Sequence, residues 1–296
     1  MSKKLQFLGP KPELTDPLRA RAVILPIPLE KTTSYLKGTA LGPEAIVDAS
    51  HQVEFFDREL ACEPCELGIY TDWELAGPDL NEHPTEKALE RIGNRVDYWL
   101  AKEKFVLALG GEHTLTVGAV TPFLERYKDS LTVVQIDAHA DLRDEYEGNP
   151  YSHACAMRRL LGRVPIVSVG IRSIDLAEYE LSRSHGGVRL FYAHEMRKNP
   201  GWIQEVAAAV RTPHVYLTVD VDGLDPSVIP STGTPEPGGL SWWEILDLAK
   251  TLAERFAIVG ADIVELCPGP AHYAEYTAAK LAYKILGYSL ILRPKS

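Results

Sequence analysis

The stretch Gln135-Ile-Asp-Ala-His-Ala-Asp141 carries most of the information about the fold and chemistry of this chain. It continues an apolar run that begins at Leu131, and its potential metal ligands Asp137, His139 and Asp141 alternate. Alternate side chains on an extended backbone point to the same face. The stretch therefore predicts a strand that ends in three potential ligands.

Two further apolar runs end in the same kinds of residue. Val215-Tyr-Leu-Thr-Val-Asp-Val-Asp222 places Asp220 and Asp222 two positions apart, and Phe105–Leu109 is followed by Gly110-Gly-Glu-His113. The three runs together bring four aspartates and two histidines to strand ends. This grouping predicts a cluster that binds two divalent cations.

Short runs rich in β-branched residues alternate with longer amphipathic segments along the whole chain. The candidate strands are Ala22–Pro26, Glu66–Tyr70, Phe105–Leu109, Leu131–Ile136, Pro165–Val169, Val188–Phe191, Val215–Val219 and Ile258–Val264. The candidate helices are Pro84–Glu103, Thr114–Tyr127, Trp242–Phe256 after a capping Ser241, and Tyr273–Tyr288. This alternation predicts parallel strands with right-handed crossovers. We expect one domain over residues 1–296, a three-layer α/β/α sandwich with a mostly parallel sheet of about eight strands.

Composition limits the classes of partner. The chain has 296 residues with a formal net charge of −10 and a pI near 5.4. An acidic surface argues against nucleic acid and anionic membranes as partners and weakly favours cationic substrates. No run approaches the ~18 apolar residues of a membrane helix, and the N-terminus lacks signal-peptide features, so we expect a cytoplasmic protein. Cys62-Glu-Pro-Cys65 has no second pair with which to complete a zinc site.

The ligand types favour a particular metal and reaction. Adjacent carboxylates in a buried site repel one another, and divalent cations remove that repulsion. A set rich in carboxylates, with some imidazole and no thiolate, suits Mn²⁺ and less well Zn²⁺ or Co²⁺. Two metals that share a carboxylate lower the pKa of a bridging water and supply hydroxide near neutral pH. These ligands predict hydrolysis at an electrophilic carbon or phosphorus.

Several motifs in fixed order resemble those of one enzyme family. They are Gly110-Gly-Glu-His113, Asp137-Ala-His-Ala-Asp141, Ser152-His153, Asp220-Val-Asp-Gly-Leu-Asp-Pro226 and Gly233-Thr-Pro-Glu-Pro-Gly-Gly239. In this order and spacing they resemble the ureohydrolases, the arginase and agmatinase superfamily, and most closely a bacterial or archaeal agmatinase. The resemblance covers nearly the whole chain, and Ser34–Ile46 is similar to the family's N-terminal loop and helix start.

The resemblance implies a role for each site residue. Two Mn²⁺ ions per chain would be bound, one by His113 and Asp141, the other by His139 and Asp222, with Asp137 and Asp220 bridging both. Asp141 would also orient the hydroxide that attacks the guanidinium carbon. His153 would shuttle protons without binding metal, and Glu265 would bind the guanidinium. The alternatives are a structural loop histidine at position 153 and a strand-capping carboxylate at position 265.

The loop after the second metal motif bears on the substrate. In arginases, Asn and Ser side chains of this loop bind the α-carboxylate of arginine. Here the loop is Leu142–Tyr151, and the residue two positions past Asp141 is Arg143. Its acidic residues Asp144, Glu145 and Glu147 suit an amine better than a carboxylate, although they could equally form a solvated loop. We therefore expect hydrolysis of agmatine to putrescine and urea.

Other readings stay open at this point. The substrate could be guanidinobutyrate, guanidine or arginine, and formiminoglutamate fits less well because it carries two carboxylates. A degenerate site would leave a metal-binding protein that recognises polyamines without turnover, and a deacetylase would use one zinc. The resemblance also suggests a homo-oligomer, a trimer or hexamer. The departures Cys155 and Cys267 have no assigned role.

Overall fold

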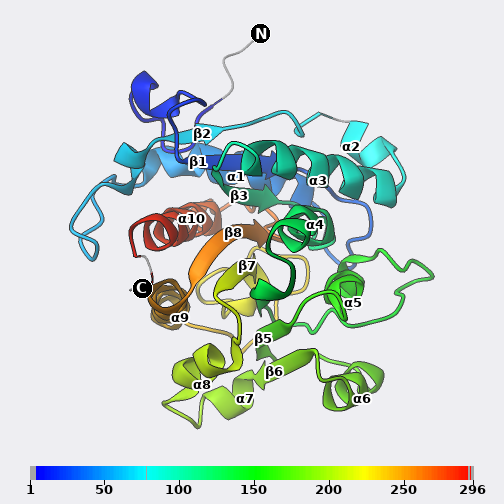
Figure 1. Ribbon diagram of the computed structural model, residues 1–296. Coiled ribbons are helices and arrows are strands. Elements are labelled where there is room, and N and C mark those ends of the chain that lie inside the picture. The colour runs from blue at the N-terminus through cyan, green and yellow to red at the C-terminus, as the bar shows by residue number, and fades with distance from the viewer. Residues whose placement is uncertain (1–4, 78, 293, 295–296) are drawn as a thin grey trace.

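A sheet of eight strands forms the centre of the protein (Figure 1). The computed structural model describes residues 5–77, 79–292 and 294, so the ends of the predicted domain 1–296 lie outside the described residues. Every pairing is parallel, in the order β2-β1-β3-β8-β7-β4-β5-β6. The strands are β1 (Ala22–Ile27), β2 (Ile69–Thr71), β3 (Phe105–Gly110), β4 (Leu131–Ile136), β5 (Ile166–Ile171), β6 (Val188–Tyr192), β7 (His214–Asp220) and β8 (Ala257–Val264). This confirms the predicted α/β fold.

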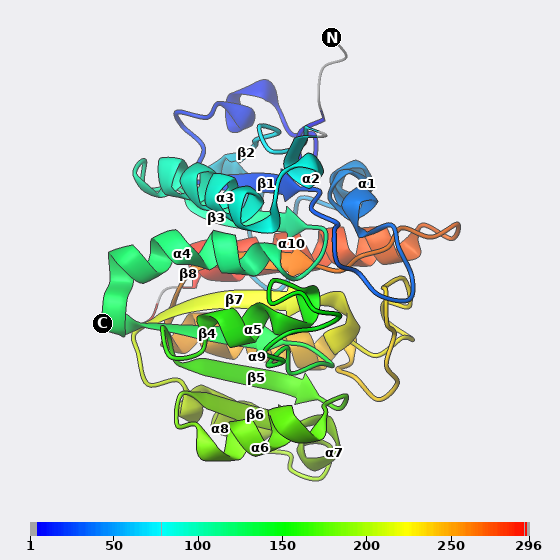
Figure 2. The ribbon, with the colours of Figure 1, turned by 90° about the vertical axis from the view of Figure 1, so that its right-hand side faces the viewer.

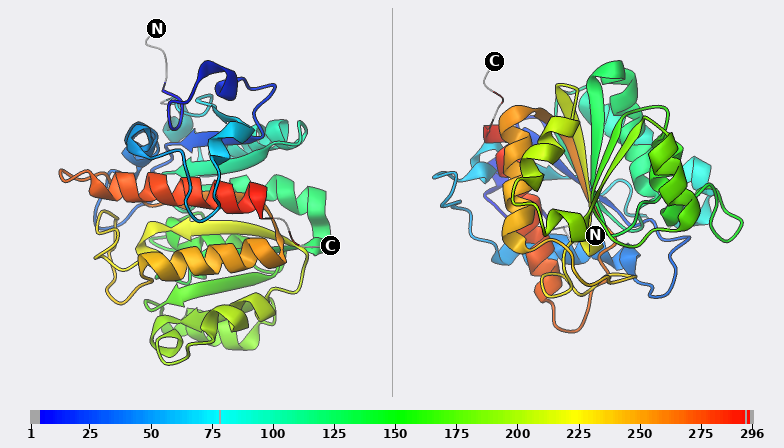
Figure 3. Two further views of the ribbon diagram at one scale, coloured as in Figure 1. Left: turned by 90° about the vertical axis from the view of Figure 1, so that its left-hand side faces the viewer. Right: turned by 90° about the horizontal axis from the view of Figure 1, so that it is seen from below.

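Helices cover both faces of the sheet, as Figure 3 shows. One layer contains α1 (Gly42–Ala49), α7 (Ala193–Met196), α8 (Trp202–Ala209), α9 (Trp242–Arg255) and α10 (Tyr273–Ile291). The other contains α2 (Asp79–Glu82), α3 (Thr85–Leu100), α4 (Leu115–Tyr127), α5 (Ala156–Leu160) and α6 (Leu176–Ser184). Short 3₁₀ helices lie at Pro12–Thr15, Thr39–Leu41, Ser50–Gln52, Pro64–Leu67, Lys128–Ser130, His153–Cys155 and Val221–Gly223.

Burial on both faces explains why the strands are apolar throughout. Every residue of β1, β3, β4 and β5 is buried, because a hydrophobic core lies on each side of the sheet. Helix α3 turns Ala88, Ile92 and Val96 toward one core, as its apolar stripe predicts. Among the described helices, none is long and apolar enough to cross a membrane.

The sequence predictions differ from the structure at a few element boundaries. The predicted strand Glu66–Tyr70 begins only at Ile69, because a 3₁₀ helix starts at Pro64 and Gly68 has a φ of +80°. Helices α2, α5, α6, α7 and α8 were not predicted. Helix α6 has a capping box of its own, in which Asp175 accepts from the backbone of Glu178.

The strand order places the functional motifs together. The four central strands β3, β8, β7 and β4 are neighbours, although β3 and β4 follow each other in the sequence. Their carboxyl ends point to the same edge, where the loops after the strands gather (Figure 2). Ligands of such sheets bind at this edge.

The capping box of α9 gives a test of the fold. The Ser241 hydroxyl accepts from the Glu244 backbone, and the Glu244 carboxylate accepts from the Ser241 backbone. We expect Ser241→Ala to lower the free energy of unfolding by about 1 kcal/mol, because a helix-end N–H loses its partner. Urea denaturation measures this, with Ser184→Ala as the control, since the Ser184 hydroxyl donates to carbonyls of its own helix, those of Glu180 and Leu181. Equal stability of both variants would contradict the capping role.

Candidate metal centre

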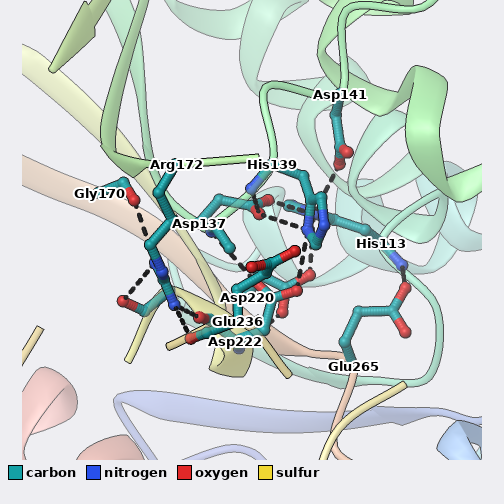
Figure 4. A network of polar contacts seen from close by, with 12 residues as sticks. His113, Asp137, His139, Asp141, Gly170, Arg172, Asp220, Asp222, Glu236 and Glu265 are labelled. Atoms are coloured by element: carbon teal, nitrogen blue, oxygen red, sulfur yellow. Dashed lines mark hydrogen bonds and ion pairs between the residues drawn. The ribbon is translucent and has the colours of Figure 1, made fainter. Parts of the chain in front are cut away.

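His113 lies at the centre of one group of carboxylates (Figure 4). The Thr218 hydroxyl lies 2.9 Å from its Nε2 atom, which fixes the ring and turns Nδ1 toward the carboxylates. Carboxylate oxygens of Asp137, Asp141 and Asp220 lie 3.1, 3.0 and 3.4 Å from Nδ1. The ends of β3, β4 and β7 thus meet at one imidazole, as the sequence predicted.

His139 forms a second group beside the first. Its Nδ1 atom lies 3.0 Å from Asp222 and 3.7 Å from Asp137. The backbone supports this arrangement, because the Ala138 N–H donates to Asp222 and the Asp222 N–H donates to Asp220. Asp137 belongs to both groups, within each of which the candidate ligand atoms lie within 4.8 Å of one another. The geometry therefore offers two adjacent sites with a shared carboxylate.

The electrostatics of the cluster fit divalent cations. Burial, together with repulsion from Asp137, raises the pKa of Asp141 to about 7. Burial and repulsion from Asp222 and Asp137 raise the pKa of Asp220 well above its usual value. The cluster therefore resists full ionisation until positive charge is added. Among the described residues, the Nδ1 atom of His113 has no hydrogen-bond partner although three carboxylates surround it, as a metal ligand would be placed.

His153 lies in the same pocket but outside both ligand groups. Its backbone N–H donates to the Thr32 hydroxyl at 2.9 Å. The hydroxyls of Ser34 and Ser152 lie 3.3 Å from its Nε2 and Nδ1 atoms respectively. Burial lowers the pKa of His153 to about 4, so the ring is neutral at pH 7.

Glu265 follows β8 and closes the pocket behind His113. Its Oε1 atom accepts from the His113 backbone N–H at 2.7 Å, and its own N–H donates to Gly111. Glu265 and Asp141 have φ angles of +65° and +53°, a conformation that costs free energy in residues with a side chain. Such strain is typical of functional positions, and it is held here by the surrounding hydrogen bonds.

The acidic-loop explanation of substrate choice is wrong. Asp144 is exposed and forms ion pairs with Arg158 and Arg159 at 3.2 and 2.9 Å. None of Asp144, Glu145 and Glu147 lines the cavity of about 270 Å³ that contains the cluster. Their charges are neutralised or point to solvent, which is the solvated-loop alternative.

Other acidic groups line the cavity in their place. Asp175 and Glu178, at the start of α6, both face it. Arg143 pairs with Asp175 at 2.6 Å and stands 5.4 Å from the centre of the Tyr146 ring. Glu178 is buried and accepts from the Leu142 N–H at 2.8 Å. The outer part of the cavity therefore has two carboxylates and one guanidinium.

Several residues that position the ligands were not predicted. Gln135 donates to Asp137 at 2.7 Å and accepts from the Ser168 hydroxyl. Glu112 is buried and accepts from the backbone of Thr32, so it fixes the loop that contacts His153. The detectable signal was polarity inside otherwise apolar strands, at Gln135, Ser168 and Thr218.

Comparisons with known proteins agree with this geometry. The family model described as the arginase family matches residues 20–289. The N(1)-aminopropylagmatine ureohydrolase of Synechocystis sp. is 43% identical, over 96% of this chain and 93% of that protein. The agmatinase of Halalkalibacterium halodurans is 32% identical, over 90% and 92%. The crystal structure of agmatine ureohydrolase of Thermoplasma volcanium has a TM-score of 0.85 and 30% identity, over 98% and 95%.

The shared carboxylate gives a prediction about metal content. We expect Asp137→Ala to lose both ions of the Mn²⁺-loaded protein, because Asp137 belongs to both ligand groups. Asp222→Ala should retain about one ion, because it disrupts only the group that contains His139. Metal analysis after gel filtration measures both, with Asp144→Asn as the control. Full metal content in Asp137→Ala would rule out its bridging position.

Proposed function

The chain belongs to the arginase family, and we propose that its substrates are agmatine and agmatine extended at the amine. It is a ureohydrolase of the agmatinase type, an enzyme that acts on C–N bonds of linear amidines. The observation that supports this most directly is one cavity that contains both the metal-ligand cluster and a pair of carboxylates, Asp175 and Glu178. The substrates have a guanidinium at one end, at least one amine beyond it, and no carboxylate.

Two Mn²⁺ ions complete the proposed site. In the proposed site His113 and Asp141 would hold one ion, and His139 and Asp222 would hold the other. Asp137, which belongs to both ligand groups, and Asp220, which lies 3.4 Å from Nδ1 of His113, would be shared by the two ions. When bound, the ions supply an activated water and positive charge for the developing tetrahedral centre.

The protein's own residues orient the substrate and move the proton. Glu265 keeps one carboxylate oxygen on the His113 N–H and uses the other for the guanidinium, whose charge favours the ionised carboxylate. Asp141 orients the attacking water. Water adds to the guanidinium carbon, the bond from that carbon to the alkyl nitrogen breaks, and the amine leaves with a proton passed through Nε2 of His153. The products are urea and the free amine, which is putrescine when the substrate is agmatine.

The names of two relatives point to different substrates. The Synechocystis relative named for N(1)-aminopropylagmatine is 43% identical, and the Halalkalibacterium relative named agmatinase is 32% identical. The outer wall favours either compound over arginine, because Asp175 and Glu178 already flank its guanidinium, that of Arg143, and an α-carboxylate would add a third negative charge. We propose N(1)-aminopropylagmatine as the preferred substrate and agmatine as the second.

The proposal extends to the organisation of the chain. We propose that residues 1–296 form a single ureohydrolase domain, supported by one sheet that runs through the described residues. We also propose a homo-oligomer, a trimer or hexamer, on the strength of the family resemblance. Size-exclusion chromatography with light scattering measures the oligomer.

A substrate panel tests the proposed function. We expect kcat/KM for N(1)-aminopropylagmatine and for agmatine to exceed that for arginine at least ~10²-fold, because the carboxylate of arginine faces like charge. Urea release from these three compounds and guanidinobutyrate measures the order. Neutralising Asp144, Glu145 and Glu147 together serves as the control and should leave the ratio unchanged, since none lines the cavity. Equal rates on arginine and agmatine would reject the proposed substrate class.

Substitution of His153 separates chemistry from metal binding. We expect His153→Asn to lower kcat by roughly 10²-fold or more, because the leaving amine loses its proton donor. The metal content should stay at the wild-type value, since His153 lies outside both ligand groups. Metal analysis alongside steady-state kinetics distinguishes the roles, and loss of metal would make His153 a ligand.

A further inference from the structure

Among the residues that the structure describes, the hydrogen-bond acceptors of the Arg172 side chain are all main-chain oxygens. Arg172 follows β5, and its guanidinium donates to carbonyl oxygens of three segments (Figure 4). These oxygens belong to Gly170 at 3.0 Å, Asp222 at 2.5 Å, Gly223 at 3.5 Å, Leu224 at 3.4 Å, Glu236 at 2.8 Å and Pro237 at 3.2 Å. A planar guanidinium has five N–H donors for these six oxygens, of which those of Leu224 and Gly223 are the most distant, whereas an ammonium has three.

The backbone of the same residue holds the other metal-ligand segment. The N–H groups of Arg172 and Ser173 both donate to the carbonyl of Ala138, at 2.9 and 3.0 Å. Ala138 lies between Asp137 and His139, and its own N–H donates to the Asp222 carboxylate. Arg172 therefore connects the segment that carries His139 to the segment that carries Asp222.

A third connection reaches the rim of the cavity. Glu236 and Pro237 lie in the segment Gly233–Gly239, of which Gly233 and Thr234 line the cavity. Near Gly223 and Gly239 the backbones of these segments lie so close that a side chain would not fit. A Cβ at Gly223 would lie 2.7 Å from the Asp137 backbone nitrogen, and one at Gly239 would lie 2.5 Å from the Leu224 carbonyl carbon. The segments pack against each other tightly enough for a displacement of one to move the next.

We propose that Arg172 is a positioning residue that sets the metal site formed by His139 and Asp222 and couples that site to the rim segment Gly233–Gly239. This inference rests on the proposed metal-dependent function. A positioning Arg172 and a purely electrostatic Arg172 would change the affinity for the metal in opposite directions. A cation beside a metal site repels the metal, so a purely electrostatic Arg172 would weaken metal binding. A positioning Arg172 strengthens it by holding the ligands in place.

Two substitutions separate geometry from charge. Arg172→Lys keeps the charge and loses the planar set of donors, and Arg172→Gln loses both. We expect each to weaken one of the two Mn²⁺ sites by roughly 10- to 100-fold and to leave the other close to the wild-type affinity. Titration with Mn²⁺, following the free ion by electron paramagnetic resonance, measures both sites. The matched control is Arg189→Lys, an exposed arginine near the start of the edge strand β6.

Kinetics provide a second readout. At saturating Mn²⁺ we expect Arg172→Lys to recover most of its kcat, since the proposal places Arg172 away from the reacting atoms. The KM for agmatine should stay raised several-fold, because the rim segment is no longer held. If kcat of the variant stays low at saturating Mn²⁺ while KM is unchanged, Arg172 does not couple the metal site to the rim segment.

Amide exchange of the wild-type protein tests the coupling even where the variants fail to fold. We expect Mn²⁺ to slow deuterium exchange in peptides that cover residues 223–240. If the rate of deuterium exchange in these peptides is the same with and without Mn²⁺, the inference is overturned. If the wild type holds about two Mn²⁺ and Arg172→Lys or Arg172→Gln binds both as tightly or more tightly, Arg172 does not position the site and the proposed function stands. If the wild type holds fewer than two, the proposed function fails.

Discussion

Mutual repulsion among buried carboxylates is the constraint around which this edge of the sheet is built. Asp137, Asp141, Asp220 and Asp222 are all buried, and two histidines lie among them. Burial and like charge raise the pKa of Asp141 and Asp220, so the fold holds these carboxylates together against their own repulsion, which His113 and His139 offset in part. The cluster persists because rigid parallel strands, apolar on both faces, fix where each carboxylate lies. A divalent cation bound there would replace this repulsion with attraction.

The strand order explains why the cluster forms from distant parts of the chain. β3 and β4 are consecutive in sequence, yet β8 and β7 lie between them in the sheet. The ends of all four strands therefore meet, and each contributes at least one residue to the site. The apolar runs and the alternation of Asp137, His139 and Asp141 are local features, which is why the fold class and the six ligand candidates could be predicted from sequence. The structure brings these ligands together, and their roles stay proposals.

What sequence reasoning missed depends on long-range partners. An acidic loop at positions 144–147 was expected to face the substrate, but Arg158 and Arg159 neutralise Asp144. No local pattern reveals which of several charged neighbours a side chain will contact. The same holds for Arg172, whose acceptors are backbone carbonyls with no signature in side-chain chemistry. The start of the strand predicted from Glu66 was wrong for a local reason, since a 3₁₀ helix over Pro64–Leu67 and Gly68 at a positive φ come first.

The two ends of the cavity are formed by different structural elements, and only one of them can change substrate preference without disturbing the core. The metal end consists of strand termini that the core holds rigidly, so a displaced ligand would disturb the packing of the sheet. The outer end consists of the start of α6 and of loops, where Arg143 and Asp175 form an ion pair at the cavity wall. We expect substitutions there to alter which amine or carboxylate is accepted while leaving the ligands in place. The names of two relatives, N(1)-aminopropylagmatine ureohydrolase and agmatinase, differ in the amine end of the substrate, as this division would allow.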